Sequence, residues 1–338
     1  GTSCYLYFKI YEPTAKDIIL SHYDTILTRN DFSQTVTSTT TGTIYKSLDA
    51  SQYDNDGEVY YFAGNPTDNW VQFGGYYWRI IRINGNGTIR MIYQGTSANI
   101  TGEGTQIGTS AFNENSNDNA YVGYMYGTPG SSTYEETHAN TNDSTIKQRL
   151  DEWYANESGL IEYPEYLDGN TGFCGDREPS TIQTSMNGSG GTRTMTTYYG
   201  AYIRFMNSNK QPTFGCQNSS DLYTTSGSGE RNGALQYPIG LISADEVAYA
   251  GSVWNTNNQG YYLYTNQEYW TMSPFWFDYA NGWAYMFLVY SDGSLNSDWD
   301  DHVSNMWGIR PVINLKADVT ITGSGTTSDP YKVEGAKS

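Results

Sequence analysis

The chain has 338 residues and a net charge of −18, and only 16% of its residues are charged while 15% are aromatic. Ile, Val, Leu and Phe account for only 57 residues, a content typical of disordered chains, but 52 aromatic residues exclude disorder because disordered chains lack aromatic rings. The acidic balance excludes nucleic acid as a partner, and no apolar run reaches the roughly 18 residues of a membrane span. We therefore expect a folded protein with a core built largely on aromatic rings.

The N-terminal part of the sequence predicts a single helix. Thr14 is a suitable N-cap, and a partial 3.6-residue hydrophobic period follows it through about Leu27. The Thr-rich stretch 35–43 after it indicates a strand edge or a linker. We therefore divide the chain into an N-terminal helix and linker segment, residues 1–50, and a main domain, residues 51–338.

Aromatic and aliphatic runs predict strands in the next part of the chain. The run 59–62 indicates one strand, and the runs 76–83 and 88–93 indicate a hairpin because the sequence Asn-Gly-Asn-Gly at 84–87 separates them. Residues 95–143 are rich in Gly, Asn, Ser and Thr, which is typical of long loops.

Two more short helices are expected farther along. Ser144 is the N-cap of the first, and Ser243 opens the second with a capping box that Glu246 completes before Gly251 ends the helix. Residues 168–233 are again rich in loop-forming residues, and the rest of the chain alternates short aromatic runs with turns. These patterns predict an α+β fold with an irregular antiparallel sheet, two or three short helices and long loops.

Three cysteines bear on where the protein works. Cys174 and Cys216 both lie in polar loops, and a disulfide between them would close a loop of about 43 residues and add on the order of 4 kcal/mol of stability. The alternative is that both are unpaired buried thiols. Cys4, near the start of the sequence, is left without a partner. Abundant Thr, Asn, Ser and Gly with scarce Lys favour a secreted or cell-surface protein, where disulfides persist.

Motifs for catalysis or metal binding are few. The sequence has no zinc-binding pattern, no nucleophile elbow and no phosphate-binding loop. Asp298, Asp300 and Asp301 beside His302 could serve a carbohydrate-active enzyme, but its paired carboxylates would have to face each other across a cleft. No segment matches the spacing of a calcium loop, although the side-chain oxygens of 298–301, 54–56 or 113–119 are ligands that calcium could use. We expect no enzymatic activity, no cofactor and no metal, and we keep the glycosidase as an alternative.

Five segments, in their order and spacing, resemble a known protein family. They are Phe73-Gly74-Gly75-Tyr76-Tyr77-Trp78-Arg79-Ile80-Ile81, Pro238-Ile239-Gly240-Leu241-Ile242-Ser243, Tyr269-Trp270-Thr271-Met272-Ser273-Pro274, Asp292-Gly293 and Gly308-Ile309-Arg310-Pro311-Val312. Over roughly residues 58–333 the chain is similar to bacterial surface proteins with a C-type-lectin-like fold, of the branch shared with formylglycine-generating enzymes. That family includes the variable proteins of diversity-generating retroelements.

The resemblance implies an adhesin-like or receptor-like protein that binds a protein or glycan on another cell, phage or host surface. Enzymes of this branch use a cysteine near the C-terminus, whereas the last cysteine here is Cys216, so their activity is not implied. The motifs with which animal lectins bind sugar through calcium are also missing. Whether a retroelement diversifies the binding face stays open. The N-terminal helix ahead of a β-rich head leaves a structural subunit of a surface filament or pilus-like fibre as the alternative.

The predicted binding face lies between Pro274 and Gly308. Tyr, Trp, Asp and Asn are mixed there without a clean period, as in antibody contact surfaces, so we expect 275–279 and 298–307 to be exposed. The candidate ligand-binding residues are Phe275, Trp276, Phe277, Asp278, Tyr279, Asn281, Trp283, Tyr290, Asn296, Asp298, Trp299, Asp300, Asp301, His302, Asn305 and Trp307.

Several other residues are expected to serve the framework. The alternation of Trp283, Tyr285 and Phe287 favours a strand that faces the core, although Trp283 is also a binding candidate. Pro274 is expected to end the strand that contains Trp270, because proline cannot continue a hydrogen-bonded ladder. The remaining framework candidates are Trp78, Trp153 and Trp270 as core residues and Arg310 as a structural ion-pair or hydrogen-bond partner.

Overall fold

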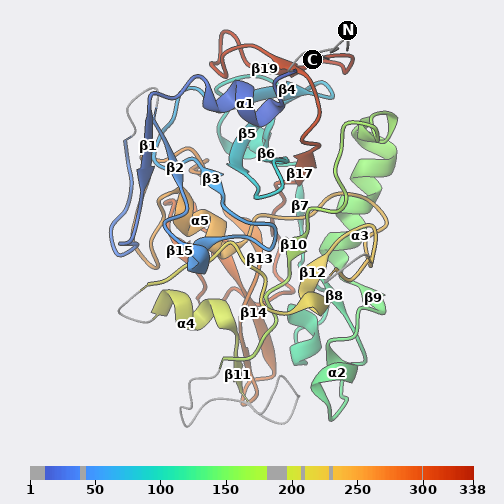
Figure 1. The fold of residues 1–338 in the computed structure, drawn as a ribbon. Coiled ribbons are helices and arrows are strands. Elements are labelled where there is room, and N and C mark those ends of the chain that lie inside the picture. Colours follow the sequence, from blue (N-terminus) through green and yellow to red (C-terminus); the bar gives the residue numbers. More distant parts are fainter. Residues whose placement is uncertain (1–11, 39–42, 181–195, 207–209, 228–230, 299) are drawn as a thin grey trace, which may run out of the picture.

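A computed structural model describes residues 12–38, 43–180, 196–206, 210–227, 231–298 and 300–338. Within these ranges five short α-helices accompany several sheets, which confirms the α+β class (Figure 1). The helices are α1 (Ala15–Leu20), α2 (Tyr134–Thr137), α3 (Thr145–Glu152), α4 (Gly200–Met206) and α5 (Ala244–Ala250). The sequence indicates only loops around α2 and α4, because helices of 4 and 7 residues hardly establish a 3.6-residue period.

The first sheet joins strands from both ends of the chain. Among the described residues it has nine strands: β1-β2-β3-β5-β4-β19-β18 in order, with β6 on the other edge of β5 and β17 beyond it. The pairs β1–β2 and β4–β19 are parallel, so the sheet is mixed and not antiparallel as predicted. The strands are β1 (Thr25–Thr28), β2 (Thr43–Lys46), β3 (Tyr60–Tyr61), β4 (Trp70–Phe73), β5 (Tyr76–Ile83), β6 (Ile89–Gly95), β17 (Val312–Leu315), β18 (Ile321–Thr322) and β19 (Tyr331–Val333).

The second sheet carries the C-terminal aromatic segment. In the part of the chain that the structure describes it has six strands, in the order β15-β14-β13-β16-β7, with β11 paired to β13. The long hairpin β13–β14 runs to the end of the molecule opposite β4 and β19 (Figure 1). The strands are β7 (Thr109–Ser110), β11 (Thr197–Tyr198), β13 (Tyr269–Asp278), β14 (Trp283–Val289), β15 (Leu295–Asn296) and β16 (Trp307–Gly308). Two small antiparallel pairs complete the strands: β8 (Met125–Tyr126) with β9 (Asn142–Asp143), and β10 (Phe173–Cys174) with β12 (Leu222–Tyr223).

Local sequence signals explain most of these elements. Thr14 and Ser243 each cap their helix with a reciprocal capping box, and Ser144 accepts a hydrogen bond from the third residue of α3, as predicted. The hairpin β5–β6 turns through Asn84, whose backbone N–H donates to Thr88 O at 2.9 Å. The predicted N-terminal helix is too long, since α1 ends at Leu20 and the β-branched residues that follow form β1.

Strand β13 continues through the proline that was expected to end it. The pairing of β13 with β14 shifts register between Trp270 and Pro274 and again between Pro274 and Trp276. Pro274 itself lies opposite Met286, and the irregularities on both sides of it interrupt the regular ladder, so the missing N–H of the proline is accommodated. The prediction failed because a strand can continue past a proline where the ladder is irregular on both sides of it.

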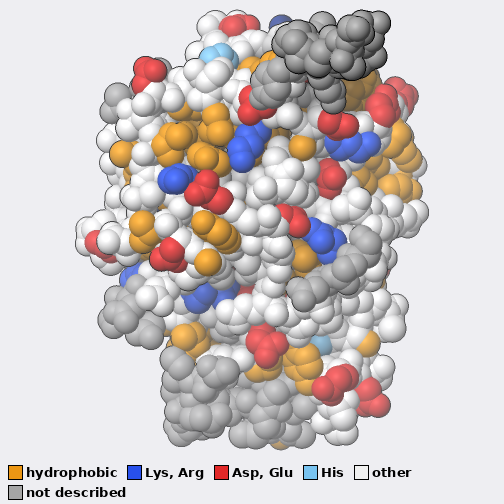
Figure 2. Space-filling view, viewed as in Figure 1, with side chains coloured by type: hydrophobic (Ala, Val, Ile, Leu, Met, Phe, Trp, Pro, Cys, Tyr) orange, Lys and Arg blue, Asp and Glu red, His pale blue; other side chains and the backbone are white. Residues whose placement is uncertain are grey.

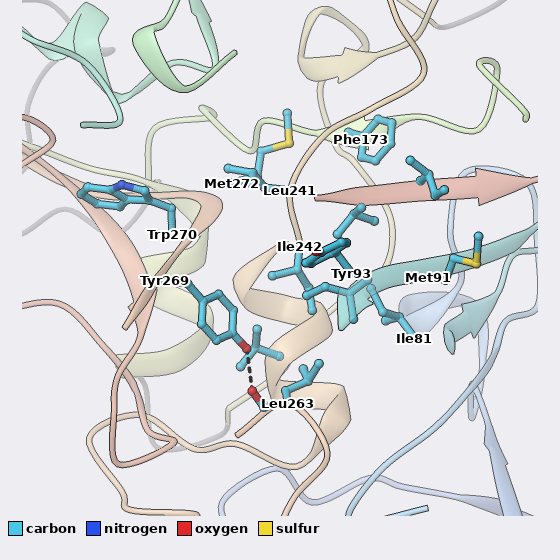
Figure 3. Close-up of a cluster of buried hydrophobic side chains, with 14 of the residues drawn as sticks. Ile81, Met91, Tyr93, Phe173, Leu241, Ile242, Leu263, Tyr269, Trp270 and Met272 are labelled. Atoms are coloured by element: carbon cyan, nitrogen blue, oxygen red, sulfur yellow. Dashed lines mark hydrogen bonds between the residues drawn. The ribbon is translucent and has the colours of Figure 1, made fainter. Parts of the chain in front are cut away.

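Aromatic rings fill the core, as the composition predicts. Trp78 and Trp270 are fully buried and Trp153 is 5% exposed. Figure 3 shows Trp270 and Tyr269 among the aliphatic and methionine side chains between the sheets. Their polar atoms are satisfied locally, because Tyr269 Oη donates to Leu263 O at 3.0 Å and Trp270 Nε1 to a backbone carbonyl at 2.8 Å. Arg310 is likewise a buried structural donor, with 3.2 Å from Nη1 to Leu263 O.

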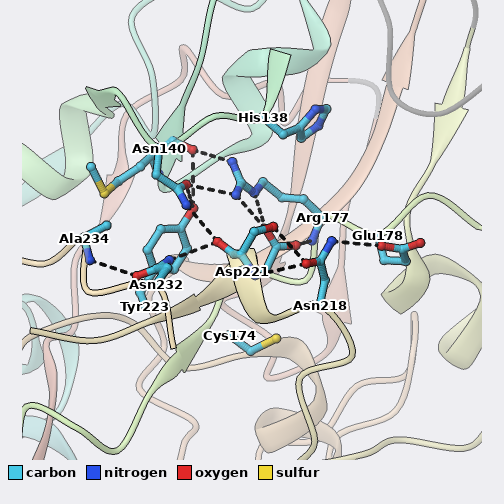
Figure 4. A network of polar contacts seen from close by, with 12 residues as sticks. His138, Asn140, Cys174, Arg177, Glu178, Asn218, Asp221, Tyr223, Asn232 and Ala234 are labelled. Atoms are coloured by element: carbon cyan, nitrogen blue, oxygen red, sulfur yellow. Dashed lines mark hydrogen bonds and ion pairs between the residues drawn. The ribbon is translucent and has the colours of Figure 1, made fainter. Parts of the chain in front are cut away.

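The loop-rich region 168–233 is held by a disulfide and a buried ion pair. Cys174 and Cys216 are bonded, with their Cα atoms 5.5 Å apart, which confirms the predicted pairing. Near this link Arg177 donates through Nε to Asp221 Oδ1 at 2.8 Å and through Nη2 to Asn140 Oδ1 at 3.0 Å (Figure 4). Both members of the ion pair are at most 1% exposed, so the pair fixes the loops from inside.

Few charges mark the surface. Figure 2 shows a face on which uncharged groups predominate, with acidic and basic side chains scattered over it singly and in small groups. None of the helices in the described residues is long and apolar enough to cross a membrane.

Candidate functional site

The hairpin β13–β14 exposes two aromatic side chains at its tip. Asp278 pairs with Trp283 as the last rung, and Gly282 closes the turn with φ +67° and an N–H that donates to Asp278 O at 2.8 Å. Tyr279 is 54% exposed and Trp283 38%. The ring of His302 lies against Trp283, with centroids 5.6 Å apart. This group of three rings forms the exposed tip of the predicted binding face.

The polar residues of the turn serve the turn itself. The carboxylate of Asp278 accepts a hydrogen bond from the backbone N–H of Ala280 at 2.9 Å and from Asn281 Nδ2 at 2.6 Å. Asp278 is 5% exposed. These contacts make Asp278 a capping residue of the hairpin, where the sequence had suggested an exposed ligand contact.

An aromatic pocket of about 170 Å³ lies beside the hairpin. Strands β11 and β13 and helix α4 meet there, and the residues that follow β15 complete the lining. Strand β11 pairs with β13 at Tyr198–Trp276, which brings rings from segments far apart in sequence together. The lining residues are Tyr198, Tyr202, Met206, Phe275, Trp276, Ser297 and Asp298.

The four aromatic rings of the pocket form a closed circuit of contacts. Tyr198 and Tyr202 have centroids 4.1 Å apart, and Tyr198 stacks on Trp276 at 5.2 Å with an interplanar angle of 22°. Phe275 lies 5.2 Å from Tyr202 and 6.0 Å from Trp276. Further rings, such as Trp254 stacked on Phe275 at 5.2 Å, support the circuit from behind. We call these four residues the aromatic cage.

The aromatic rings of the cage are mostly buried, and more exposed side chains lie at the edge of the pocket. Tyr198, Phe275 and Trp276 are each 8% exposed, so they offer only a small part of each ring to the solvent. Met206, 43% exposed, and the exposed Asp298 stand at the edge. A ligand in the pocket would therefore meet only the small exposed parts of these aromatic rings, with Met206 and Asp298 at the edge.

The electrostatic environment of the site is negative. Burial, and then the neighbouring Tyr202 and Asp278, raise the pKa of the Tyr198 hydroxyl to about 12. Burial raises the pKa of Tyr285 as well, and the carboxylates of the hairpin and of 298–301 raise it further. The sequence holds no Lys or Arg from residue 232 to residue 309. The site therefore favours neutral or cationic groups over anions.

Asp298 and Asp301 are hydrogen-bonded to each other, with the backbone N–H of Asp301 donating to Asp298 O at 2.9 Å. Asp301 is 5% exposed, and its Oδ2 accepts from the backbone N–H of Asp298 at 2.8 Å and from the Tyr290 hydroxyl. Burial raises the pKa of Asp301. Since this carboxylate is engaged in these hydrogen bonds, the structure offers no support for Asp301 as a catalytic partner of Asp298.

The structure divides the predicted binding residues into three groups. Phe275, Trp276 and Asp298 line the pocket, and Tyr279, Trp283 and His302 form the exposed tip. The others serve the framework or lie near it. Phe277, Asp278 and Asp301 are buried, Trp307 is half-buried in β16, and Asp300 is exposed. Hydrogen bonds hold the remaining four side chains: Asn281 to Asp278, Tyr290 to Asp301, Asn296 to Asn255, and Asn305 to the backbone of Asp300. Trp299 lies outside the described residues.

The expected exposure of 275–279 is wrong for four of its five residues. Strand β13 is buried along its whole length, because β11 pairs with its edge at Phe277 and Trp276 and α4 packs against it through Tyr202 and Phe275. Trp283 also differs from expectation, since the alternation predicted a core position and its side chain is exposed, whereas Tyr285 and Phe287 are fully buried as predicted. Binding by these residues remains a prediction.

Sequence reasoning missed half of the pocket. Tyr198, Tyr202, Met206 and Ser297 were not singled out, and the first three lie in the region predicted to be loop. Tyr198, Tyr199 and Tyr202 form an aromatic cluster inside a stretch dominated by Gly, Ser, Thr and Asn. This cluster is the sequence feature that could have indicated a buried or ligand-binding segment there.

A larger cavity of about 660 Å³ lies between the N-terminal segment and α4. Six of its thirteen lining residues carry amide or hydroxyl groups, Asp49 and Lys210 are charged, and its one arginine, Arg204, is paired with Asp245 at 2.7 Å and with Asp176.

Comparison with protein-family models, with curated proteins and with solved structures gives no match to this chain. Among the described residues, no group of three or more His, Cys, Asp or Glu side chains is arranged to hold a metal ion.

Proposed function

We propose that this chain is an extracellular or cell-surface ligand-binding protein with a C-type-lectin-like fold, and that its binding face lies at the end of the molecule formed by the β13–β14 hairpin. Rigid aromatic side chains supply contact area at low entropic cost, which is why Trp and Tyr dominate protein contact surfaces. The single observation that carries the proposal is the combination of the exposed rings Tyr279 and Trp283 with the aromatic pocket beside them.

The disulfide supports an oxidising compartment, because such bonds rarely persist in the cytosol. The large share of uncharged polar residues on the surface is consistent with this location. Diversification of the face by a retroelement remains part of the proposal, and a near-copy of the coding sequence for 275–307 beside a reverse transcriptase gene would support it.

Exposed rings at the tip allow a direct test. Tyr279→Ala and Trp283→Ala should leave the melting temperature nearly unchanged and weaken binding to cells, glycans or proteins in a surface-ligand screen at least tenfold. Ile161→Ala is the matched control. Ile161 is 45% exposed, so this substitution also removes exposed apolar surface, but at a site away from the hairpin. If the tip variants bind as well as the native protein, the binding face lies elsewhere.

A filament subunit is the second candidate, and strand β1 favours it. Within the described residues β1 pairs only with β2, all four of its residues are exposed, and Ile26 is 46% exposed. Exposed apolar edge strands can pair with another chain. Electron microscopy of the native protein should show fibres that Ile26→Lys abolishes; dispersed monomers in both samples would rule this candidate out.

A further inference from the structure

We propose that the cavity of about 660 Å³ between the N-terminal segment and α4 binds a neutral saccharide of one or two sugar rings. This inference goes beyond the proposed function, because it assigns a second site with its own class of ligand. Tyr202 and Met206 of α4 line the aromatic pocket beside the hairpin. Ile203 and Arg204 of the same helix line the cavity, so the two sites lie on different sides of the helix.

The cavity has the size and the fixed walls of a small-molecule site. Its volume lies within the roughly 300–1,000 Å³ of such sites, which gives room for a disaccharide. The Gln52 amide ties one wall together, because Oε1 accepts from the backbone N–H of Leu48 at 2.8 Å and Nε2 donates to Arg29 O at 2.9 Å. The segment after α4 is joined to this wall where Thr213 Oγ1 donates to Ser51 O at 3.0 Å. A ligand therefore meets walls that are already ordered, which lowers the entropic cost of binding.

Three amide side chains of the lining have unused hydrogen-bonding capacity. Asn30, Gln211 and Gln217 are exposed, and within the part of the chain that the structure describes their side chains have no hydrogen-bond partner. Each amide offers one acceptor oxygen and two N–H donors. A sugar hydroxyl is both a donor and an acceptor, so neighbouring hydroxyls of one ring can pair with the two halves of an amide. Such a ligand reproduces the hydrogen bonds of the water that it displaces.

The charges of the lining favour a neutral ligand. Arg204 is already neutralised by Asp245 at 2.7 Å and by Asp176. The other charged residues among the described lining are one of each sign, Asp49 and Lys210. Burial lowers the pKa of Lys210, so its ammonium lies where water is partly excluded. A polyanion would meet a single available cation, whereas a polyol can accept from the ammonium and donate to the carboxylate.

Apolar side chains supply the second kind of contact that a sugar ring needs. A pyranose carries hydroxyls around its edge and C–H groups on its faces, so it requires polar partners and apolar contact together. The lining includes Phe32, Leu48, Ile203 and Pro212, and Leu48 is 46% exposed. Covering this side chain on binding removes apolar surface from water. A purely apolar ligand would instead leave the amides of the lining without partners.

Titration of the native chain with lactose, maltose, cellobiose and diacetylchitobiose, followed by NMR, tests the class of ligand. We expect at least one of these neutral disaccharides to bind with a Kd below about 10 mM. We also expect a sulfated disaccharide to bind more weakly, because the lining has no excess of positive charge. Weaker binding than this limit by all four, or stronger binding of the sulfated compound, would overturn the proposal.

Chemical labelling locates the ligand. Lys210 lines the cavity, so a saturating saccharide should slow its acetylation by acetic anhydride several-fold. The exposed Lys332 lies outside the cavity and should react at the same rate with and without the saccharide. Mass spectrometry of the peptides measures both rates. An unchanged rate at Lys210 would place the ligand elsewhere and contradict the proposal.

Two variants test the amides. Gln211→Leu and Gln217→Leu each remove an exposed amide, so the fold should survive, which circular dichroism verifies. Each should weaken saccharide binding roughly two- to tenfold, the effect of losing one or two neutral hydrogen bonds. Gln236→Leu is the matched control, since Gln236 is an exposed glutamine outside the cavity. Native affinity in both cavity variants would show that the amides do not hold the ligand.

The outcome is separable from that of the proposed function. Tyr279→Ala and Trp283→Ala, which test the hairpin, should leave saccharide binding unchanged. If they abolish it, the sugar binds at the hairpin, so the proposed binding face stands and the cavity proposal falls. If a saccharide protects Lys210 while the tip variants bind surface ligands as the native protein does, the cavity proposal stands and the assignment of the face falls.

Discussion

His138 is a buried base in an acidic protein. Its ring stacks on Tyr134 with centroids 4.3 Å apart and is 4% exposed, and Nδ1 lies 3.2 Å from the carbonyl of Tyr134. Burial, and secondly the positive charge of Arg177, hold the pKa of His138 well below its usual 6.5. The imidazole is therefore neutral in the folded protein at a pH where the unfolded chain already protonates it.

This histidine makes the stability depend on pH with a definite sign. Below about pH 6.5 the unfolded state binds a proton that the folded state refuses, so the free energy of unfolding falls by up to about 1.4 kcal/mol per pH unit. Between about pH 7.5 and about pH 5 the native protein should lose about 2 kcal/mol more than His138→Gln in urea denaturation. Carboxylates affect both proteins equally, so equal losses would show that His138 accepts its proton in place.

The turn between β14 and β15 shows how an element depends on one glycine. Gly293 has φ +82°, and a Cβ there would lie 1.9 Å from the carbonyl oxygen of Asn258. Asn258 cannot withdraw easily, because its side chain donates to Gly251 O at 2.9 Å and to Val36 O at 3.1 Å. Gly282 at the hairpin tip has a similar φ of +67°, but nothing lies within 4 Å of the Cβ position.

These two glycines form a matched pair for mutagenesis. Gly282→Ala should cost about 1–2 kcal/mol, the penalty of a left-handed conformation alone. Gly293→Ala adds a clash with fixed backbone and should cost about 2–3 kcal/mol more. Chemical denaturation measures both values, and similar costs at the two sites would show that the Asn258 loop yields.

The disulfide supports the loops through the unfolded state. It spans a sequence separation of 42 residues, so opening it should lower the free energy of unfolding by on the order of 4 kcal/mol in the chain-entropy account. The double variant Cys174→Ser, Cys216→Ser should show this loss in urea denaturation. Cys4→Ser is the control, because Cys4 is not part of the bond, and an equal effect of both changes would contradict the assignment.

How far the sequence predicts these elements depends on whether the signal is local. The caps at Thr14, Ser144 and Ser243 were predicted correctly because a capping contact spans three residues. The burial of β13 was not, because it depends on β11 and α4, which come some 70 residues earlier in the chain. The same separation explains the pocket: Phe275 and Trp276 were recognised as aromatic candidates, but nothing in their own segment indicates that Tyr198 and Tyr202 close the cage.

At the scale of the whole molecule, the buried charges nearly cancel, so almost all of the net negative charge lies outside the core. The described residues hold 16 basic side chains, of which six are buried, and 35 acidic side chains, of which eight are buried. The buried bases take part in internal contacts, such as Arg90 with Glu246 at 2.6 Å. What remains outside is an excess of carboxylates at low density, which repel one another over distances that salt can screen.

Salt should therefore stabilise the folded protein. Raising NaCl from about 0.01 M to about 0.5 M shortens the screening length from roughly 30 Å to well below 10 Å, so the self-repulsion of the surface weakens and the melting temperature should rise by several degrees. Buried ion pairs such as Arg177–Asp221 are screened little and should not reverse the trend. Millimolar CaCl₂ added at constant ionic strength should contribute no further rise; a large calcium-specific rise would reveal a metal site, and a fall with NaCl would mean that attraction between surface charges outweighs their repulsion.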